Sequence, residues 1–376
     1  MQYRMGKHGE QISLLGYGCM RFTRSGGGID LDKAERELMA AIDAGVNYLD
    51  TAYIYPGSEA AVGEILRRNQ CRDRVLIATK LPQYKIVSAE GIESCFQEEL
   101  RRLKTDYIDY YLMHMLTDIA SWERLEKLGI RDWIARKKRE GAIRQIGFSF
   151  HGTPELLEKL LTDHPEAEFV QLQINYADWD NPAVASRKCY DIARRFGKPI
   201  VIMEPVKGGF LAQPPASVEK ILTEANPDVS AASWAIRFAA SLPGVLTVLS
   251  GMSDEAQMAD NLSYMGDFKP LSESEQAVIR KAQAAIAAID AIPCTGCRYC
   301  VAGCPKQIPI PNIFSAMNRE MVYGQTDDAK RRCANATTGV GKASDCIACG
   351  QCERACPQHL PIIADLKKCA AALENA

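Results

Sequence analysis

The stretch GVNYLDTAYIYPGSE, from Gly45 to Glu59, contains the pattern from which we infer the fold. A short apolar run ends in Asp50, a loop follows, and the chain continues with apolar residues at three- and four-residue spacing. That order indicates a β-strand followed by an α-helix. Similar apolar runs recur between Gly16 and Ser250: GYGCM, RVLIATK, YIDYYLMHM, IRQIGFSF, FVQLQIN, KPIVIME and GVLTVLS.

Eight strand-then-helix units over about 250 residues favour a (β/α)8 TIM barrel, which is an α/β fold. A doubly wound open sheet is the alternative, but no unit carries the Gly-rich dinucleotide fingerprint of such sheets. Ten of the fourteen cysteines lie from Cys294 onward, after a helical segment that begins near Ser272 and ends at Pro293. We therefore predict a barrel over residues 1–270, a connecting helix over 271–293 and a small α-helical domain over 294–376.

Composition indicates which kinds of partner the protein can have and in which compartment we expect it. With 376 residues and 47% apolar content, the chain can bury one large core and carry a smaller second domain. The net charge is −2 and there is no dense Lys/Arg tract, so we expect no nucleic-acid partner. The most apolar helical stretch, Ala282–Ile292, contains Asp290 and is shorter than the roughly 20 residues that span a bilayer. The N-terminus lacks the apolar core of a signal peptide, which predicts a cytoplasmic protein away from membranes.

A doubled cysteine motif predicts metal clusters in the C-terminal domain. The stretches CTGCRYCVAGCP (Cys294–Pro305) and CIACGQCERACP (Cys346–Pro357) both follow C-x2-C-x2-C-x3-C-P, the run by which bacterial ferredoxins hold [4Fe-4S] clusters. In two-cluster ferredoxins the fourth cysteine of each run serves the other cluster. We therefore predict a ferredoxin-like domain with two clusters, one held by Cys294, Cys297, Cys300 and Cys356 and the other by Cys346, Cys349, Cys352 and Cys304.

Three alternatives to clusters are structural zinc, disulfides and chance. Zinc usually takes two C-x2-C pairs per ion, so the third and fourth cysteines of each run would be surplus. Disulfides are rare in a reducing compartment. The six cysteines outside the motifs are expected to pack as small apolar side chains: Cys19, Cys71, Cys95, Cys189, Cys333 and Cys369.

Polar residues follow three consecutive predicted strands. Asp50, Lys80 and His114 end the second, third and fourth strands, and Tyr55 lies five residues past Asp50 in the loop above the same face. Catalytic groups of TIM barrels lie at the C-terminal ends of strands. Each residue alone has a structural explanation: a helix cap, a rim charge, a core histidine or a packed aromatic. Together they are expected to converge on one cavity.

These four groups suit proton donation to a carbonyl oxygen. A phenol has a pKa of about 10, a nearby ammonium lowers that pKa, and a carboxylate holds the ammonium charged and oriented. A histidine can hydrogen-bond the substrate oxygen. We therefore predict that Tyr55 protonates a carbonyl oxygen as hydride reaches the carbon.

The segments DTAYIYPGSE, ATK and YLMHM resemble the aldo-keto reductases, whose catalytic tetrad falls on Asp50, Tyr55, Lys80 and His114. IGFSFHG, QLQIN, MEPVKGG and SGMSDEAQMADNL resemble later segments in family order, and the tail resembles the ferredoxin-like extension of one bacterial and archaeal branch. The resemblance covers about residues 1–270 and implies reduction of a small carbonyl substrate with NAD(P)H. It places Ser149 and Gln171 at the nicotinamide carboxamide, Met203 at the nicotinamide ring, and Gly251, Ser253, Gln257 and Asn261 at the pyrophosphate and adenosine.

Several positions depart from the family pattern. Phe150 stands where many relatives have Asn, and Met203 stands where many have a ring-stacking tyrosine. Gly251 and Gln257 occupy the positions at which relatives that prefer NADPH often carry Lys and Arg, and the nearby Asp254 would repel a phosphate. The preference between NADH and NADPH therefore stays open.

The two halves of the chain handle different numbers of electrons. Nicotinamide passes two electrons as one hydride, whereas each cluster passes one, and a flavin is the usual cofactor that does both. No segment identifies a flavin site, so flavin stays a candidate. We consider three hypotheses. The first is an oxidoreductase whose clusters transfer electrons and which has an electron-transfer partner. The second is a carbonyl reductase with structural clusters, and the third is a non-enzymatic redox sensor. The first is favoured, and the sequence does not determine the oligomeric state.

Aromatic residues expected to line an apolar substrate pocket are Phe22, Tyr84, Trp122, Tyr176 and Trp179.

Overall fold

Eight parallel strands form the closed barrel that the sequence predicts. The computed structural model describes residues 1–182 and 184–374, so the last two residues of the predicted tail domain lie outside the described residues. The strands pair in chain order and the last pairs with the first. They are β3 (Leu15–Gly18), β6 (Tyr48–Asp50), β7 (Leu76–Leu81), β8 (Ile108–Leu116), β9 (Ile143–Phe150), β10 (Phe169–Gln173), β11 (Ile200–Met203) and β12 (Val245–Ser250).

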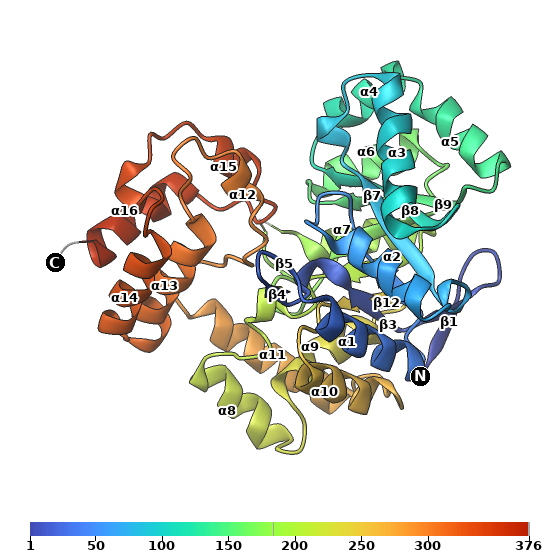
Figure 1. Ribbon diagram of the computed structural model, residues 1–376. Helices are drawn as coiled ribbons and strands as arrows, with labels where there is room; N and C mark the ends of the chain where they lie inside the picture. The colour runs from blue at the N-terminus through green and yellow to red at the C-terminus, as the bar shows by residue number, and fades with distance from the viewer. Residues whose placement is uncertain (183, 375–376) are drawn as a thin grey trace. The chain divides into compact units, whose positions relative to one another are not determined.

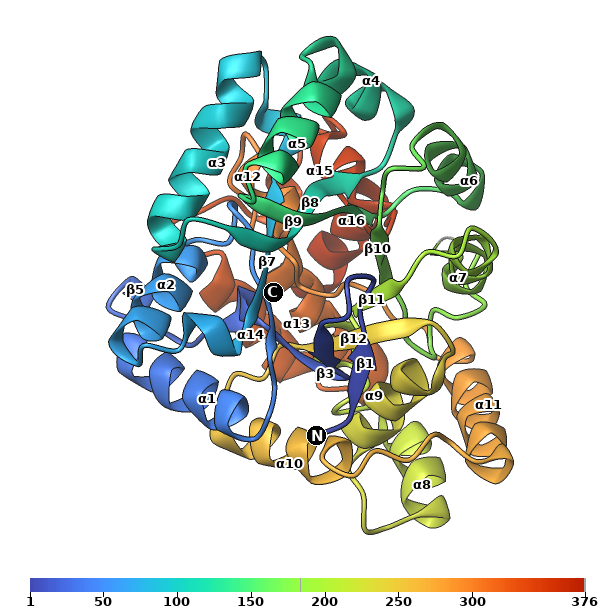
Figure 2. The same ribbon diagram turned by 90° about the vertical axis from the view of Figure 1, so that its right-hand side faces the viewer.

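Helices follow the strands and surround them, and Figure 2 shows α1, α3, α6 and α7 around the barrel. Five of the helices begin at a side chain that accepts a hydrogen bond from a backbone amide three residues on, which is the usual N-cap geometry. The caps are Asp30, Ser88, Asp118, Thr153 and Asp254. The barrel helices are α1 (Leu31–Asp43), α2 (Ser58–Arg68), α3 (Ala89–Leu103), α4 (Ile119–Lys127), α5 (Ile130–Arg139), α6 (Pro154–Asp163), α7 (Ser186–Arg195), α9 (Ala231–Ser241) and α10 (Glu255–Met265).

An apolar plug fills the barrel interior. The rings of Tyr48 and Tyr110 have centroids 5.0 Å apart, and those of Tyr110 and Phe169 are also 5.0 Å apart. The hairpin of β1 (Tyr3–Met5) and β2 (Gln11–Ser13) adds Ile12 to this core. Because the interior is packed, the polar chemistry is confined to the loops and strand ends at the C-terminal mouth. The core comprises Ile12, Tyr48, Ala78, Tyr110, Leu112, Phe169, Val201, Leu246 and Leu249.

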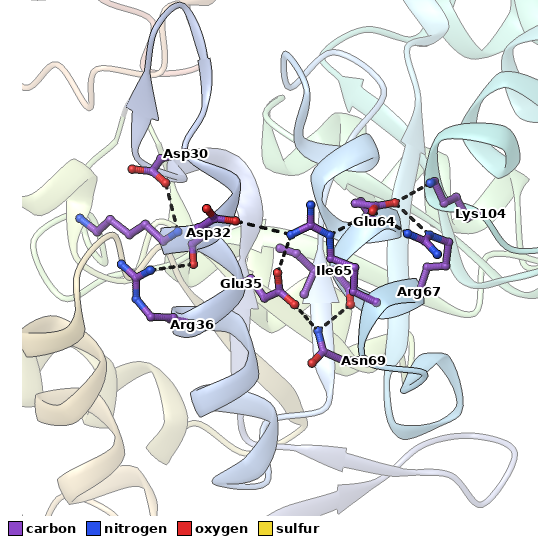
Figure 3. Close-up of polar contacts among 11 residues, drawn as sticks. Asp30, Asp32, Glu35, Arg36, Glu64, Ile65, Arg67, Asn69 and Lys104 are labelled. Atoms are coloured by element: carbon purple, nitrogen blue, oxygen red, sulfur yellow. Dashed lines mark hydrogen bonds and ion pairs between the residues drawn. The ribbon is translucent and has the colours of Figure 1, made fainter.

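An ion-pair network joins α1 to α2 on the outside of the barrel (Figure 3). The Arg68 guanidinium lies 2.9 Å from a Glu35 oxygen and 3.0 Å from a Glu64 oxygen. Glu64 also pairs with Arg67, and the Asn69 amide donates to Glu35 at 2.7 Å. Because exposed pairs of this kind contribute about 0–1 kcal/mol each, the apolar inner faces of the helices account for most of the packing energy.

The chain divides into two compact units. Unit 1 comprises Met1–Asp180, Ala185–Pro205 and Ala232–Ser272, and unit 2 comprises Asn181–Val184, Val206–Ala231 and Glu273–Ala376. The predicted boundary at residue 270 lies close to Ser272. The sequence-based prediction put the whole of residues 1–270 in the barrel, but the segment that carries α8 (Ala216–Ala225) belongs to unit 2. There α8 packs against α11 (Glu273–Ala287).

The connecting helix is shorter than predicted. It ends at Ala287, so the expected end at Pro293 is wrong. The backbone N–H of Ile292 donates to the Asn318 side chain at 2.9 Å, and the Asn318 amide donates back to the Ile292 carbonyl at 2.8 Å. These bonds replace helical bonds just before a proline, where helical backbone is disfavoured in any case.

The tail of unit 2 is α-helical. Figure 1 shows α13 (Ile310–Tyr323), α14 (Thr326–Ala336) and α16 (Ile362–Leu373) packed side by side. Two short helices, α12 (Tyr299–Ala302) and α15 (Gln351–Arg354), carry Cys300 and Cys352. All six cysteines outside the motifs are buried, as predicted. Across residues 1–182 and 184–374, we find no helix with the length and apolar character needed to cross a membrane.

Candidate functional site

A buried ion pair lies at the C-terminal ends of β6 and β7. The Lys80 ammonium is 2.7 Å from Asp50 Oδ1 and donates to the Thr51 carbonyl at 2.6 Å. The two side chains are only 2% and 7% exposed. Removing both charges from water is costly, and the cost is offset only when their remaining hydrogen-bonding capacity is also used. The Thr51 carbonyl provides that compensation for Lys80.

Gln171, on the far side of the barrel, donates a hydrogen bond that offsets the cost of burying the Asp50 carboxylate. Its amide nitrogen donates to Asp50 Oδ2 at 2.9 Å, so both oxygens of the carboxylate are bound. The amide oxygen of Gln171 is buried and accepts no hydrogen bond from the described residues. A buried acceptor of this kind has a free-energy cost until a donor reaches it. A carboxamide N–H of a bound nicotinamide would supply such a donor.

Tyr55 lies in a short loop that neighbouring hydroxyls hold in place. Thr51 Oγ1 and Ser58 Oγ are 2.8 Å apart, and Ser58 Oγ donates to the Cys19 carbonyl at 2.9 Å. The Tyr55 ring is half-buried, and its centroid lies 5.3 Å from Lys80 Nζ. The phenol is therefore close to the ammonium, and a positive charge at this distance stabilises the phenolate form.

His114 lies beside Tyr55 on β8. The two ring centroids are 6.0 Å apart and the rings are nearly perpendicular. The strand bulges between Met113 and Leu116, and Met115 takes a left-handed φ of 55° while its N–H donates to Ser149 Oγ at 2.8 Å. Burial lowers the pKa of His114 well below its usual value, and the positive charges of Lys80 and His151 lower it further. A neutral imidazole can donate a hydrogen bond to a carbonyl oxygen.

The residues expected at the nicotinamide lie on three neighbouring strands. Ser149 on β9 is in register with Gln171 on β10, and Gln173 is in register with Met203 on β11. Ser149 is buried, and Met203 packs against the barrel core. Phe150, which stands in the Asn position, is buried near Phe148 at 6.2 Å between ring centroids.

The four residues expected at the pyrophosphate and adenosine follow β12. Asp254 caps α10, and the Gln257 side chain is held by Asp254 and by the backbone N–H of Ser253, both within 3.0 Å. Asn261 is buried and donates to Ser250 Oγ at 2.6 Å. Arg21 lies against Gly251, because a Cβ there would be 3.4 Å from the Arg21 side chain. The carboxylate of Asp254 thus occupies the helix N-terminus, where a phosphate would otherwise be favoured.

Unit 2 contains two cavities ringed by motif cysteines. The first brings Cys356 of the second motif together with three cysteines of the first motif. Burial raises the pKa of Cys300, and the thiols of Cys297, Cys294 and Cys356 raise it further, as expected for closely spaced thiols. Apolar side chains such as Phe314 form the rest of the wall. The cysteines around the first cavity are Cys294, Cys297, Cys300 and Cys356.

The second cavity has the complementary set. It is lined by Cys304 of the first motif and by Cys346, Cys349 and Cys352 of the second. Within the described part of the chain, no three His, Cys, Asp or Glu side chains converge on the position of a single metal ion. A cube needs no such convergence, because each thiolate binds a different iron. Four thiolates around an apolar cavity therefore suit the chemistry of a [4Fe-4S] cluster.

Ile310, at the start of α13, lines both cavities, so the two are neighbours. Sequence reasoning did not identify this shared wall. The isoleucine follows the first motif by five residues but lies 36 residues before the second, and no local pattern marks it as a wall between two cavities.

Most of the aromatic residues expected to line a substrate pocket pack against neighbouring rings. Trp122 stacks on His164 with 4.2 Å between centroids, and its place in the pocket stays a prediction. Tyr176 and Trp179 pack against Phe238, and Phe22 packs against Tyr17. Tyr84 is 39% exposed and lies 6.4 Å from the His114 ring, which suits a wall beside the reacting groups. Aromatic residues in loops and helices are often used for local packing, and sequence alone does not separate the two uses.

Two family profiles match different parts of the chain. Residues 14–284 match the profile described as "Aldo/keto reductase family". Residues 293–360 match the profile described as "4Fe-4S dicluster domain". The first match spans the barrel and the second spans the cysteine motifs.

Relatives of known sequence or structure resemble the barrel. "Uncharacterized oxidoreductase YqkF" of Bacillus subtilis is 25% identical over 72% of this chain and 93% of its own length. "6-dehydroglucose reductase" of Novosphingobium aromaticivorans is 26% identical over 68% of this chain and 88% of its own. The holo form of an aldo-keto reductase from Bacillus halodurans is 26% identical, with a TM-score of 0.60 over 75% of this chain and 96% of that structure.

The low pKa of His114 leads to a test of the site's electrostatics. Histidine-selective NMR should show His114 neutral from pH 8 down to below about 6.5, the usual pKa of histidine, because burial and nearby positive charge disfavour protonation. Lys80→Met should raise this pKa more than His151→Gln does, because Lys80 has the larger effect of the two. A wild-type titration near the usual histidine value would contradict this account of the site.

Proposed function

The chain belongs to the aldo-keto reductase family, and from this premise we propose that it reduces a small carbonyl substrate with NAD(P)H, using Tyr55 as the proton donor. The observation that carries the proposal is the closeness of Tyr55 to both Lys80 and His114: its ring centroid is 5.3 Å from the ammonium and 6.0 Å from the imidazole centroid. We further propose that the 4Fe-4S domain holds two clusters that take part in electron transfer.

Each member of the tetrad has a separate task. His114, neutral because of its lowered pKa, donates a hydrogen bond to the carbonyl oxygen and orients it toward the phenol. The Tyr55 hydroxyl gives its proton to that oxygen, and the Lys80 ammonium stabilises the phenolate that remains. Asp50 holds the Lys80 side chain in place through the bond of 2.7 Å. Bound NAD(P)H supplies the hydride that reaches the carbonyl carbon.

The residues at the strand ends fit a nicotinamide. The buried oxygen of Gln171 offers an acceptor to a carboxamide N–H, and Ser149 lies next to it in the sheet register. Met203 can place its thioether against a ring face. Asp254 at the start of α10 disfavours an additional phosphate, so NADH and NADPH both need testing as reductants.

Two features support electron transfer by the tail. The cysteines ring two cavities, and each cavity takes three cysteines from one motif and the fourth from the other. The cavities share Ile310, so clusters bound there would be close enough to exchange electrons. A flavin remains the candidate for converting between the two-electron chemistry of nicotinamide and the one-electron chemistry of the clusters. The alternative is a carbonyl reductase whose clusters only stabilise the fold.

The proton-donor role is tested with Tyr55→Phe. The substitution keeps the ring and removes the hydroxyl, so kcat for carbonyl reduction should fall by roughly 10²- to 10⁴-fold, the usual contribution of general acid catalysis, while nicotinamide binding stays nearly unchanged. Tyr53→Phe is a matched control, because Tyr53 stacks on Arg102 at 4.3 Å. Wild-type turnover by Tyr55→Phe would rule out the tetrad chemistry.

The cluster assignment is tested by counting iron. Anaerobically purified protein should contain about eight irons and about eight acid-labile sulfides, as two cubes require. Cys304→Ala should remove about one cluster, because it deprives the second cavity of a ligand. Cys333→Ala, a buried cysteine outside the motifs, is the control.

Double variants test which cysteines share a cluster. Cys304→Ala with Cys349→Ala should lose no more iron than either change alone, because both line the second cavity. Cys304→Ala with Cys297→Ala should lose nearly all the iron, since these residues line different cavities. The reverse pattern would show that each motif binds its own cluster.

A further inference from the structure

The two cysteine cavities of unit 2 differ in exposure. Among the residues that line the first cavity, Arg298 is exposed and all the others are buried or half-buried. The second cavity has an exposed wall, which we call the rim: Pro305, Lys306, Ile347, Cys349 and Gln351. Cys349 is exposed, whereas the corresponding cysteine of the first motif, Cys297, is half-buried.

The loop that carries the first cysteines packs against a segment that follows β11 in the chain. Gly208 follows β11 and belongs to the same compact unit as the cysteine motifs. It has a left-handed φ of 65°, and a Cβ at this position would overlap the backbone of Thr295. Thr295 lies between Cys294 and Cys297. The first cysteine loop therefore packs directly against the segment that continues from β11.

The positions of the cavities define an inner and an outer site. The first cavity is next to the segment that follows β11, the second has the exposed rim, and Ile310 separates them. A one-electron carrier from solution would therefore reach the second cavity first.

The rim and the loop beside it each expose a large apolar side chain. Ile347 is 57% exposed and Val340 is 40% exposed, and they are the large apolar side chains that the described part of unit 2 exposes. The Val340 loop reaches the rim, because a Cβ at the adjacent Gly341 would overlap the Lys306 carbonyl. Exposed apolar side chains beside a redox site are suited to contact with another protein.

The surroundings of the rim are positively charged. Lys306, Lys342 and Arg354 are all exposed. Two carboxylates in the same segments remain negatively charged while they accept backbone N–H groups: Asp345 accepts from Lys342 at 2.8 Å, and Glu353 accepts from Ile363 at 2.9 Å. Residues 294–374 hold ten Lys and Arg against seven Asp and Glu, although the whole chain has a net charge of −2.

We propose that the rim and the adjacent Val340 form the docking surface for an acidic one-electron carrier protein, which exchanges electrons with the cluster of the second cavity. The proposal rests on the two-cluster assignment made above. In each encounter the reduced carrier loses one electron and the oxidised cube gains one, with no proton transferred. Opposite charges accelerate such encounters, and complexes of redox proteins commonly bury less than about 1,200 Å². A small apolar patch with surrounding cations suits such a transient complex.

The test uses reduced flavodoxin, an acidic one-electron carrier, and follows cluster bleaching in the full-length holoprotein by stopped flow. The second-order rate constant should fall about tenfold or more in Lys306→Glu and in Ile347→Asn, and it should fall with added salt in the wild type. Arg331→Glu makes the same charge change on α14, which does not line either cavity, and should have at most a small effect.

Iron content separates this proposal from the two-cluster assignment. If the wild type holds far fewer than eight irons, the two-cluster assignment fails. If the iron content is full and the rate constant of cluster bleaching is unchanged in both rim variants, only the docking surface is overturned. An equal loss of rate in Arg331→Glu would also overturn it, because the effect would then be one of net charge. If Lys306→Glu lowers iron content, Lys306→Gln provides the same comparison with half the charge change.

Discussion

The buried ion pair between Asp50 and Lys80 is the interaction on which the proposed chemistry depends. The pair holds the Lys80 ammonium 5.3 Å from the centroid of the Tyr55 ring and close enough to His114 to lower its pKa. The ammonium disfavours the protonated form of the histidine, and in the proposed mechanism it also stabilises the phenolate that Tyr55 leaves after proton transfer. Both effects serve reduction of a carbonyl group, which needs a ready proton donor and a neutral hydrogen-bond donor.

The barrel fold lowers the free-energy cost of burying this ion pair. Asp50 and Lys80 end neighbouring strands, and Gln171 reaches Asp50 from the opposite side of the barrel at 2.9 Å. A buried carboxylate with both oxygens bound costs far less than an unsatisfied one. The amide oxygen of the same glutamine is buried and accepts no hydrogen bond from the described residues, and we propose that a nicotinamide carboxamide binds it. In this proposal one side chain links charge stabilisation to cofactor recognition.

The sequence predicted those parts of the structure that follow from local periodicity. All eight strands, the convergence of Asp50, Lys80, Tyr55 and His114, and the burial of the six remaining cysteines follow from alternation, strand-end position and apolar character. The sequence did not predict the early end of α11, because the competing bonds come from Asn318, which lies 26 residues away from Ile292 in the chain. It also did not predict that Trp122 stacks on His164, because composition does not show which way a helical side chain points. The shared wall at Ile310 and the unequal exposure of the two cavities depend on tertiary packing and have no local signal.

The central claim is that the barrel and the clusters belong to one redox system. Its most direct test is anaerobic addition of NADH or NADPH, followed by visible absorption and electron paramagnetic resonance, with and without added flavin. We predict that the cluster absorption bleaches and that a reduced-cluster signal appears, at once or when flavin is supplied. Clusters that stay oxidised under all these conditions, while the same protein reduces a carbonyl substrate at full rate, would contradict the claim and assign the clusters a structural role.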